Sequence, residues 1–343
     1  MNHRPFILAR PITLLALLAM PVILASCNLS RGGEADLSDS DSGSSAPRTA
    51  PGQGHVDSAN AALSAGDREL ALSEFTRAIA VNPNLTTAHL GVADIYREQQ
   101  DYPKAESSYR RAAQIEPRNF DAQYYHGLML HLLDRVTEAV QAYLRALAVQ
   151  PNSFEANLNL SSAYYQLSEN NQALVYGKRA VELDPRSGPA RFTLGNINAE
   201  LGRHADAVKE YQQAAELMDL TPGLLMNLAK SLGQTGRYTE MRNALLELLK
   251  KEESAGGHER LGFAAFQLGK FDEALASFNR SLTLEPDYYP ALNGLGVIYL
   301  NQWITGAQSD PALKRRGIDA LRRSLQIKRD QPFILDLLTK YGR

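Results

Sequence analysis

The segment from Leu90 to Pro117 reads LGVADIYREQQDYPKAESSYRRAAQIEP. In its second half, AESSYRRAAQI, small and apolar residues recur three and four positions apart. That spacing places them on one face of a helix, so it predicts a helix with a single buried stripe. Pro117 then stops this helix, because proline has no backbone N–H to donate and its ring clashes with the preceding turn.

Prolines recur at a constant interval around this segment. Pro83, Pro117, Pro151 and Pro185 are each separated from the next by 34 residues. Five residues before these prolines stand Ala78, Ala112, Ala146 and Ala180, and twelve residues before them stand Ala71, Ala105, Ala139 and Ala173. Eight residues before them stand Phe75, Tyr109, Tyr143 and Gly177. A fixed period of this size predicts stacked supersecondary units instead of one globule.

This pattern resembles the tetratricopeptide repeat, which has small residues in slots eight, twenty and twenty-seven, an aromatic residue in slot twenty-four and proline in slot thirty-two. The match runs from about Gly54 to Asp330, and a second clear copy is LGFAAFQLGKFDEALASFNRSLTLEP, which ends at Pro286. The resemblance implies an all-α fold, a right-handed superhelical solenoid of about eight helical hairpins plus a C-terminal capping helix. No hairpin can bury its stripe alone, so stability is expected to be a sum over neighbours.

The chain is predicted to have four parts. They are a lipoprotein signal peptide at 1–26, a lipidated cysteine with a flexible tether at 27–54, the repeats at 55–330 and the capping helix at 331–343. The repeat units are expected near 55–85, 86–119, 120–153, 154–187, 188–220, 221–254, 255–288 and 289–330. Left-handed residues are expected to end the first helix of a hairpin at Gly66, Gly202, Gly236 and Gly269.

Two units depart from the pattern. The sixth has Met241, Leu245 and Leu248 where small or aromatic residues are usual. Its neighbourhood is also one residue short, so the stack is expected to kink or loosen around 249–257. In the eighth, the turn is expected to lengthen by about nine residues through 302–314. That loop holds the only tryptophan, Trp303. Trp303 is expected either to contact a partner or to pack onto its own hairpin.

The N-terminus resembles that of bacterial lipoproteins. An uncharged apolar run of 15 residues, PITLLALLAMPVILA, is shorter than the ~20 residues of a comfortable bilayer span but suits a secretion signal. It leads into Leu24-Ala25-Ser26-Cys27, which looks like a lipobox and contains the only cysteine. The resemblance implies that Cys27 becomes the acylated first residue of the mature protein. An ordinary signal peptide, or an uncleaved anchor with an incidental cysteine, is the alternative.

The residues after Cys27 predict where the protein is located and how far its folded part can extend from the membrane. Asn28, where inner-membrane lipoproteins commonly have aspartate, favours the periplasmic face of the outer membrane, with the exterior or the inner membrane as alternatives. Residues 28–54 contain six serines, five glycines and two prolines, which leaves little to bury. A Gly/Ser-rich coil of this length spans about 30 Å and would let a folded body stand off the membrane.

No motif for catalysis or metal binding occurs in the sequence. The Walker lysine, G-x-S-x-G and H-E-x-x-H are absent, and His126 and His131 are five apart, not the four of helical metal ligands. We therefore expect no enzyme, no cofactor and no metal. A net charge of −2 argues against a nucleic-acid partner. The run from Lys314 to Arg329 carries +6 and could meet acidic lipids or an acidic partner, but a solvated convex face is the simpler interpretation.

The resemblance places partner binding in the concave groove, which the first helix of each hairpin lines with slots two, five, six, nine and twelve. Carried onto this chain, the slots give Tyr124, Tyr125, Leu128, His131, Leu158, Asn159, Ser162, Tyr165, Phe192, Thr193, Asn196, Met226, Asn227 and Lys230. Amides can pair with a peptide backbone and rings can hold its side chains. A groove face merely tolerant of mixed residues is the alternative.

Some members of the family bind the C-terminal carboxylate of a partner, and they use a lysine in slot five. The residues in slot five of this chain argue against that kind of ligand. The slot reads Leu90, Tyr124, Leu158, Phe192, Met226, Glu259 and Asn293. We therefore expect a lipid-anchored, non-catalytic scaffold that binds partner protein segments. It is similar to tetratricopeptide lipoproteins that assist envelope machines such as type IV pili or secretins. The alternative is a spacer or adaptor in polysaccharide export or cell-wall remodelling.

Overall fold

The computed structural model describes residues 50–342. The predicted signal peptide, Cys27 and the predicted tether as far as residue 49 lie outside the described residues. Within residues 50–342 there are seventeen α-helices and no strand. Their bounds are α1 (Gln53–Ser64), α2 (Arg68–Val81), α3 (Thr86–Glu98), α4 (Tyr102–Ile115), α5 (Phe120–Leu132), α6 (Val136–Val149), α7 (Phe154–Gln166), α8 (Asn170–Leu183), α9 (Gly188–Glu200), α10 (His204–Leu217), α11 (Pro222–Gln234), α12 (Tyr238–Lys251), α13 (Ala255–Gln267), α14 (Phe271–Leu284), α15 (Tyr289–Thr305), α16 (Pro311–Ile327) and α17 (Pro332–Tyr341).

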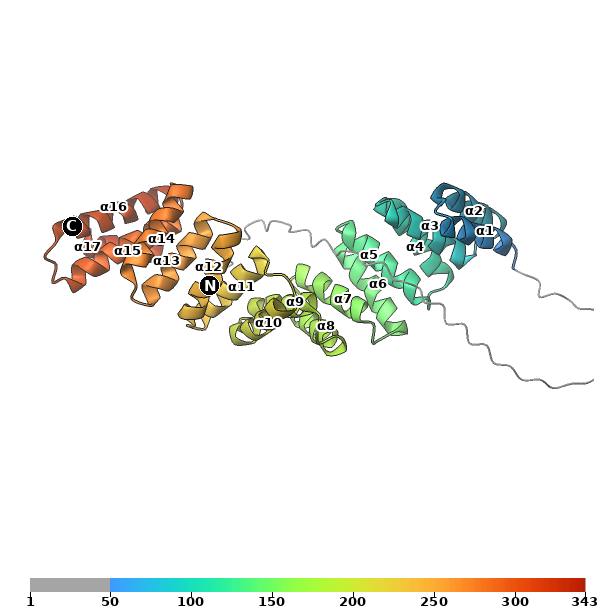
Figure 1. The fold of residues 1–343 in the computed structure, drawn as a ribbon, viewed down its shortest axis with the longest axis horizontal. Coiled ribbons are helices and arrows are strands. Elements are labelled where there is room, and N and C mark those ends of the chain that lie inside the picture. Colours follow the sequence, from blue (N-terminus) through green and yellow to red (C-terminus); the bar gives the residue numbers. More distant parts are fainter. Residues whose placement is uncertain (1–49, 343) are drawn as a thin grey trace, which may run out of the picture. The chain divides into compact units, whose positions relative to one another are not determined.

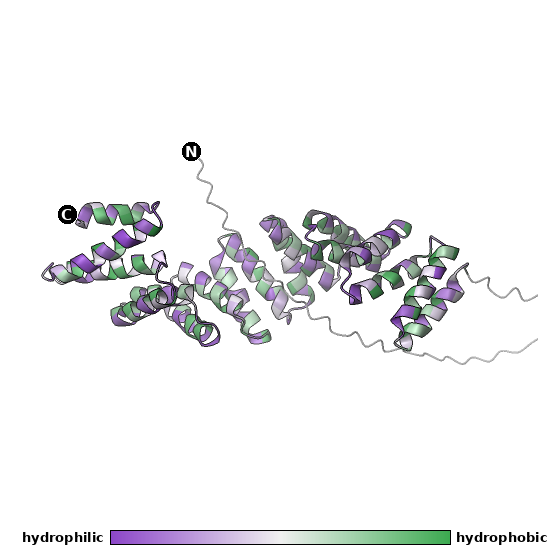
Figure 2. Ribbon diagram, turned by 90° about the horizontal axis from the view of Figure 1, so that it is seen from above, coloured by the Kyte–Doolittle hydropathy of each residue, from purple (hydrophilic) through white to green (hydrophobic). Residues whose placement is uncertain are grey.

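The helices follow one another in chain order (Figure 1), and each packs mainly against the helix before it and the helix after it. Hydrophobic and hydrophilic residues alternate along the helices (Figure 2). The buried apolar side chains form a series of local clusters, each shared by neighbouring helices. This arrangement confirms the predicted all-α solenoid of eight hairpins followed by a capping helix, α17.

The boundaries of the helices follow from the periodic prolines and the polar residues beside them. The second helix of each of the first four hairpins ends two residues before its proline, as α4 ends at Ile115 before Pro117. The chain then restarts a helix with a side-chain cap: Asn119 Oδ1 accepts a hydrogen bond from the backbone N–H of Ala122 at 3.0 Å. Such a cap satisfies an N–H that the first helical turn leaves without a partner.

The turns inside the first seven hairpins have three residues, and the middle one adopts a left-handed conformation. Gly66, Gly202, Gly236 and Gly269 take it, as predicted, with φ between 72° and 79°. In the other three hairpins the same place is held by Gln100, Asp134 and Ser168 with φ between 59° and 61°. These three were not predicted, because a side chain other than glycine gives no clear signal for this conformation.

The interior of a hairpin explains the periodic small residues. Ala105 in α4 and Tyr109 one turn later are completely buried. In the fifth hairpin, Gly195 of α9 lies so close to Tyr211 of α10 that an added Cβ would come within 2.6 Å of the ring. Helices can approach this closely only where one of them has no bulk, because a larger side chain would overpack the contact.

The sixth hairpin fills the same space differently. Met241, Leu245 and Leu248 of α12 are buried in a cluster with Leu224 and Leu228 of α11. The missing residue falls between α12 and α13, where the linker 252–254 has three residues instead of the four that join the other consecutive hairpins. This linker lies inside the region predicted to kink or loosen.

The eighth hairpin corrects a prediction. The extra residues do not form a long loop, because α15 and α16 each extend to 17 residues and the turn between them is only 306–310. Trp303 lies in α15, with its ring 6.1 Å from that of Tyr341 and 5.2 Å from the Lys314 ammonium. It packs with the cluster of Leu300 and Ile334. The tryptophan therefore joins its own hairpin to the capping helix.

The predicted basic run lies on α16, and several of its charges contact the chain itself. Arg323 donates to the Pro286 carbonyl oxygen at 2.9 Å and to Asp287 at 3.1 Å, while Lys328 donates to the Tyr289 hydroxyl at 3.1 Å. Between residues 50 and 342, no helix combines the length and the apolar character needed to cross a membrane.

Candidate functional site

The first helices of the second to eighth hairpins are here called the odd-helix face: α3, α5, α7, α9, α11, α13 and α15. Helices two apart in the chain approach each other closely on this side, as α5 does α7, α7 does α9, α9 does α11 and α13 does α15. No pair of even-numbered helices comes as close within the described residues. In a curved stack, the side with the closer spacing is the inner side.

The fourteen predicted groove residues lie on four consecutive helices of this face, α5, α7, α9 and α11. Leu158 and Asn159 are buried, and Lys230 is exposed. The remaining eleven are half-buried: Tyr124, Tyr125, Leu128, His131, Ser162, Tyr165, Phe192, Thr193, Asn196, Met226 and Asn227. This is the degree of exposure expected of side chains that line a surface without projecting from it.

The amides of this face are partly paired with the chain itself. Asn159 of α7 donates to the Tyr124 hydroxyl of α5 at 3.0 Å. Asn227 of α11 donates to the Asn196 side-chain oxygen of α9 at 2.9 Å, and the Tyr211 hydroxyl donates to the same oxygen at 2.8 Å. These bonds join successive odd-numbered helices, so part of the amides' hydrogen-bonding capacity holds the stack together.

Each amide nevertheless keeps one group without a partner. Within residues 50–342, no protein group pairs with the side-chain oxygens of Asn159 and Asn227 or with the side-chain N–H groups of Asn196. The face therefore presents two acceptors and one donor group among aromatic rings. Acceptors can bind a peptide N–H and donors a peptide C=O, so the chemistry suits an extended polypeptide.

Rings are held in place at the α5 end of this surface. Tyr125 stacks on Tyr109 with the ring centroids 5.4 Å apart. The Arg97 guanidinium also lies over the Tyr125 ring, 4.9 Å from its centroid. Tyr124 meets Tyr125 edge-on at 5.0 Å. Such ordered rings give a binding surface that loses little side-chain entropy when a partner arrives.

His131 ends the predicted set on α5. Its Nε2 lies 3.1 Å from the Gln166 side-chain oxygen of α7, and burial lowers the pKa of His131, opposed by that hydrogen bond. His126 instead pairs with Glu106 of α4 at 3.1 Å. The two histidines therefore contact different helices. No group of three metal-ligating side chains occurs in residues 50–342.

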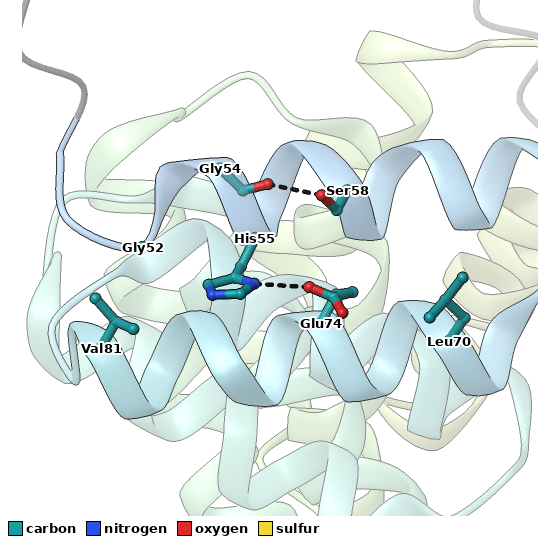
Figure 3. A pocket seen from close by; sticks show the side chains of 7 residues that line it. All are labelled: Gly52, Gly54, His55, Ser58, Leu70, Glu74 and Val81. Atoms are coloured by element: carbon teal, nitrogen blue, oxygen red, sulfur yellow. Dashed lines mark hydrogen bonds and ion pairs between the residues drawn. The ribbon is translucent and has the colours of Figure 1, made fainter.

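A shallow pocket of about 520 Å³ lies on the first hairpin (Figure 3). His55 of α1 points toward Glu74 of α2, with Nδ1 2.7 Å from the carboxylate, and Arg77 donates to the same carboxylate. The hydrogen bond with His55 lowers the pKa of Glu74. These contacts join α1 to α2.

Comparison with known proteins agrees with this architecture. Models described as tetratricopeptide repeat match residues 56–120, 158–224 and 256–288, and one described as TPR repeat matches 127–168. Together they cover more than half of the chain, which therefore belongs to the tetratricopeptide repeat family. Folds of this class are typically non-catalytic scaffolds for protein–protein interaction.

Solved structures share the fold. The C-terminal part of a TPR repeat-containing protein from Cytophaga hutchinsonii is 16% identical, with a TM-score of 0.54 over 69% of this chain and 98% of that one. YrrB, described as a TPR protein with an unusual peptide-binding site, is 18% identical, with a TM-score of 0.50 over 58% of this chain and 99% of that one. At these identities the likeness shows the fold alone. Among curated proteins, none matches this chain in sequence.

Proposed function

We propose that this protein is a lipid-anchored scaffold of the bacterial envelope that binds segments of partner proteins on the odd-helix face of α5, α7, α9 and α11. The observation that carries the proposal is the set of unpaired amide groups on Asn159, Asn196 and Asn227, placed among half-buried rings. A polypeptide can satisfy these groups along its backbone, whereas a small ligand would reach only one or two of them.

The anchor and location are the second part of the proposal. Cys27 closes an apolar signal-like run, and residues 28–49 supply a tether to the first helix. Two or three acyl chains would hold the repeats at a membrane surface, with about 0.8 kcal/mol for each buried CH₂ group. We place the protein at the periplasmic face of the outer membrane.

The binding proposal is tested with the full chain carrying Tyr124→Ala, Asn159→Ala and Phe192→Ala together. The wild-type chain, used as bait on detergent-solubilised envelopes, is expected to retain a partner that this variant loses. A matched control carries Gln172→Ala, Val175→Ala and Leu217→Ala, three exposed residues of the even-numbered helices α8 and α10. It should retain the partner.

Because the first variant removes partly buried groups, Lys230→Glu gives a second test. Lys230 is exposed and cannot affect the core, yet it lies in the predicted set on α11. Reversal of its charge should weaken capture while circular dichroism stays unchanged. If the wild-type chain, the triple variant, the control and Lys230→Glu all retain equal amounts of partner, the proposed binding face is wrong.

The finer role that we propose is assistance to an envelope machine such as a pilus or a secretin. A chromosomal neighbourhood of pilin and secretin genes would support it. Neighbouring glycosyltransferase or hydrolase genes would instead support a spacer in polysaccharide export or cell-wall remodelling.

A further inference from the structure

One position of the odd-helix face differs in charge from all its equivalents. Glu259 of α13 occupies slot five, whose other occupants are apolar, aromatic or amide side chains. A carboxylate costs free energy when it is taken from water, and it is usually paired when shielded. Glu259 therefore calls for a physical explanation that a packing role does not supply.

Other shielded glutamates of this chain are paired. Glu74 bonds to His55, Glu106 to His126 and Glu210 to Arg191, at 2.7, 3.1 and 3.0 Å. Glu259 is half-buried, and within residues 50–342 it has no hydrogen bond or ion pair. Burial raises the pKa of Glu259, and only the neighbouring Arg260 opposes this. Arg260 acts on the Glu259 carboxylate through its charge, but within residues 50–342 it forms no hydrogen bond or ion pair with it.

Two aromatic side chains lie one helical turn to either side of this carboxylate. The Tyr288 hydroxyl lies 3.2 Å from the place that a Cβ on Gly256 would take, which is one turn before Glu259 on α13. This hydroxyl has no hydrogen-bond partner in the described chain, and the charges of Glu259 and Arg260 both act on it, in opposite directions. Phe263, one turn after Glu259, is 38% exposed and meets Tyr238 edge-on.

The next helix of the face adds an acceptor. Asn293 has the same register on α15 as Glu259 has on α13, and these two helices contact each other. Its N–H donates to Gln331 at 2.7 Å, while its side-chain oxygen is buried without a partner. We call Glu259, Phe263, Tyr288 and Asn293 the acidic subsite. It offers negative charge and two rings, and the Asn293 oxygen beside them is buried.

We propose that the acidic subsite receives a lysine or arginine side chain of the partner segment that binds along the odd-helix face. The inference rests on the proposed function and names the chemistry of the partner. A cationic side chain donates several hydrogen bonds, which suit the carboxylate oxygens of Glu259, and its charge is attracted to ring faces. A metal ion does not fit, because one carboxylate is too few for a protein site.

The test begins with random twelve-residue peptides displayed on phage and selected on the immobilised full chain. The pool selected on the wild-type chain is expected to contain lysine and arginine at several times their frequency in the unselected library. With Glu259→Gln, peptides should still be retained but this enrichment should disappear. The matched control is Glu216→Gln, which changes an exposed, unpaired glutamate of α10 and should keep the enrichment.

The affinity of one selected peptide for the variants then measures the interaction between Glu259 and the basic residue of the peptide. Glu259→Gln should weaken its binding about tenfold, as should replacement of the basic residue in the peptide by glutamine. Combining both changes should cost no more than either alone, because each removes the same interaction. Glutamine has the shape of glutamate, so unchanged thermal unfolding of the variant is expected.

The possible outcomes separate the two proposals. If the wild-type chain retains peptides with no excess of basic residues, or if Glu259→Gln gives the same pool, the acidic subsite is wrong and the binding face stands. If the wild-type chain retains no peptide above a blank surface, the proposed function fails and the subsite fails with it.

Discussion

At the scale of single residues, the two helices of a hairpin pack closely because a large side chain on one helix lies against a small residue on the other. Gly127 lies under Tyr143 and Gly195 under Tyr211, with added Cβ atoms 2.8 and 2.6 Å from the rings. In the fourth hairpin the division differs, because Gly177 holds the aromatic slot and a Cβ there would meet the Ser161 hydroxyl at 2.8 Å. Bulk on one helix is thus matched by its absence on the other.

The first prediction concerns this matching. Gly195→Ala should lower the free energy of unfolding, because overpacking costs about 1–3 kcal/mol and exceeds the ~1 kcal/mol that alanine gains over glycine in a helix. Gly223→Ala is the control, since no atom lies within 4 Å of an added Cβ there. Urea unfolding of the full chain should rank Gly195→Ala below both Gly223→Ala and the wild type. A Gly195→Ala chain as stable as the control would contradict the packing argument.

At the scale of helices, the sequence was a better guide to where helices end than to where extra residues go. The prolines and turn glycines located the ends of most helices before the structure was known. The insertion of the eighth hairpin was predicted as a loop, yet it became helix. Within α15, the added turn carries Trp303 onto α17, and burial of that ring offsets the cost of ordering the segment.

The second prediction follows from this contact. A chain that stops after Asp330 lacks α17, and it should lose on the order of 3 kcal/mol or more from the eighth hairpin, because Ile334 and its neighbours no longer cover the core. Trp303 is the only tryptophan, so its emission reports this site alone and should move to longer wavelength. Phe333→Ala is the control, since Phe333 is 64% exposed on the same helix. If truncation leaves the emission of Trp303 unchanged, the capping role is wrong.

At the scale of the whole molecule, stability is expected to spread along the stack without one central core. The clusters are local, and each is shared only by neighbouring helices. The shortened linker at 252–254 joins the hairpin of α11 and α12 to that of α13 and α14. The amide groups lie before this point and the acidic subsite after it, so a partner that uses both must be long and extended.

The third prediction concerns attachment of the whole molecule. In a Gram-negative host supplied with radioactive palmitate, the wild-type chain should take up label and partition into detergent. Cys27→Ser should take up none, because serine cannot form the thioether, and Ser30→Ala should behave as the wild type. Label in Cys27→Ser, or a wild-type chain that stays unlabelled, would exclude the lipid anchor.

The sequence by itself determined the repeat, because the constraints behind it are local and periodic. A proline that ends a helix, an alanine that admits a neighbouring helix and a glycine that turns the chain each act within one hairpin. The 34-residue period predicted stacked units, and the resemblance to the tetratricopeptide repeat implied the family and the number of hairpins. Glycines predicted the turns at Gly66, Gly202, Gly236 and Gly269. The resemblance also supplied the register from which the groove residues were predicted.

Only the tertiary structure decided which of those residues remain available to a partner. The asparagines looked equally free in the sequence, but Asn159 and Asn227 each donate to the preceding odd-numbered helix. Glu259 looked like one more exception in slot five, and packing of α13 against its neighbours made it a shielded charge with no hydrogen bond or ion pair in residues 50–342. Pairing and desolvation depend on atoms about thirty-four residues away, which a local pattern does not contain.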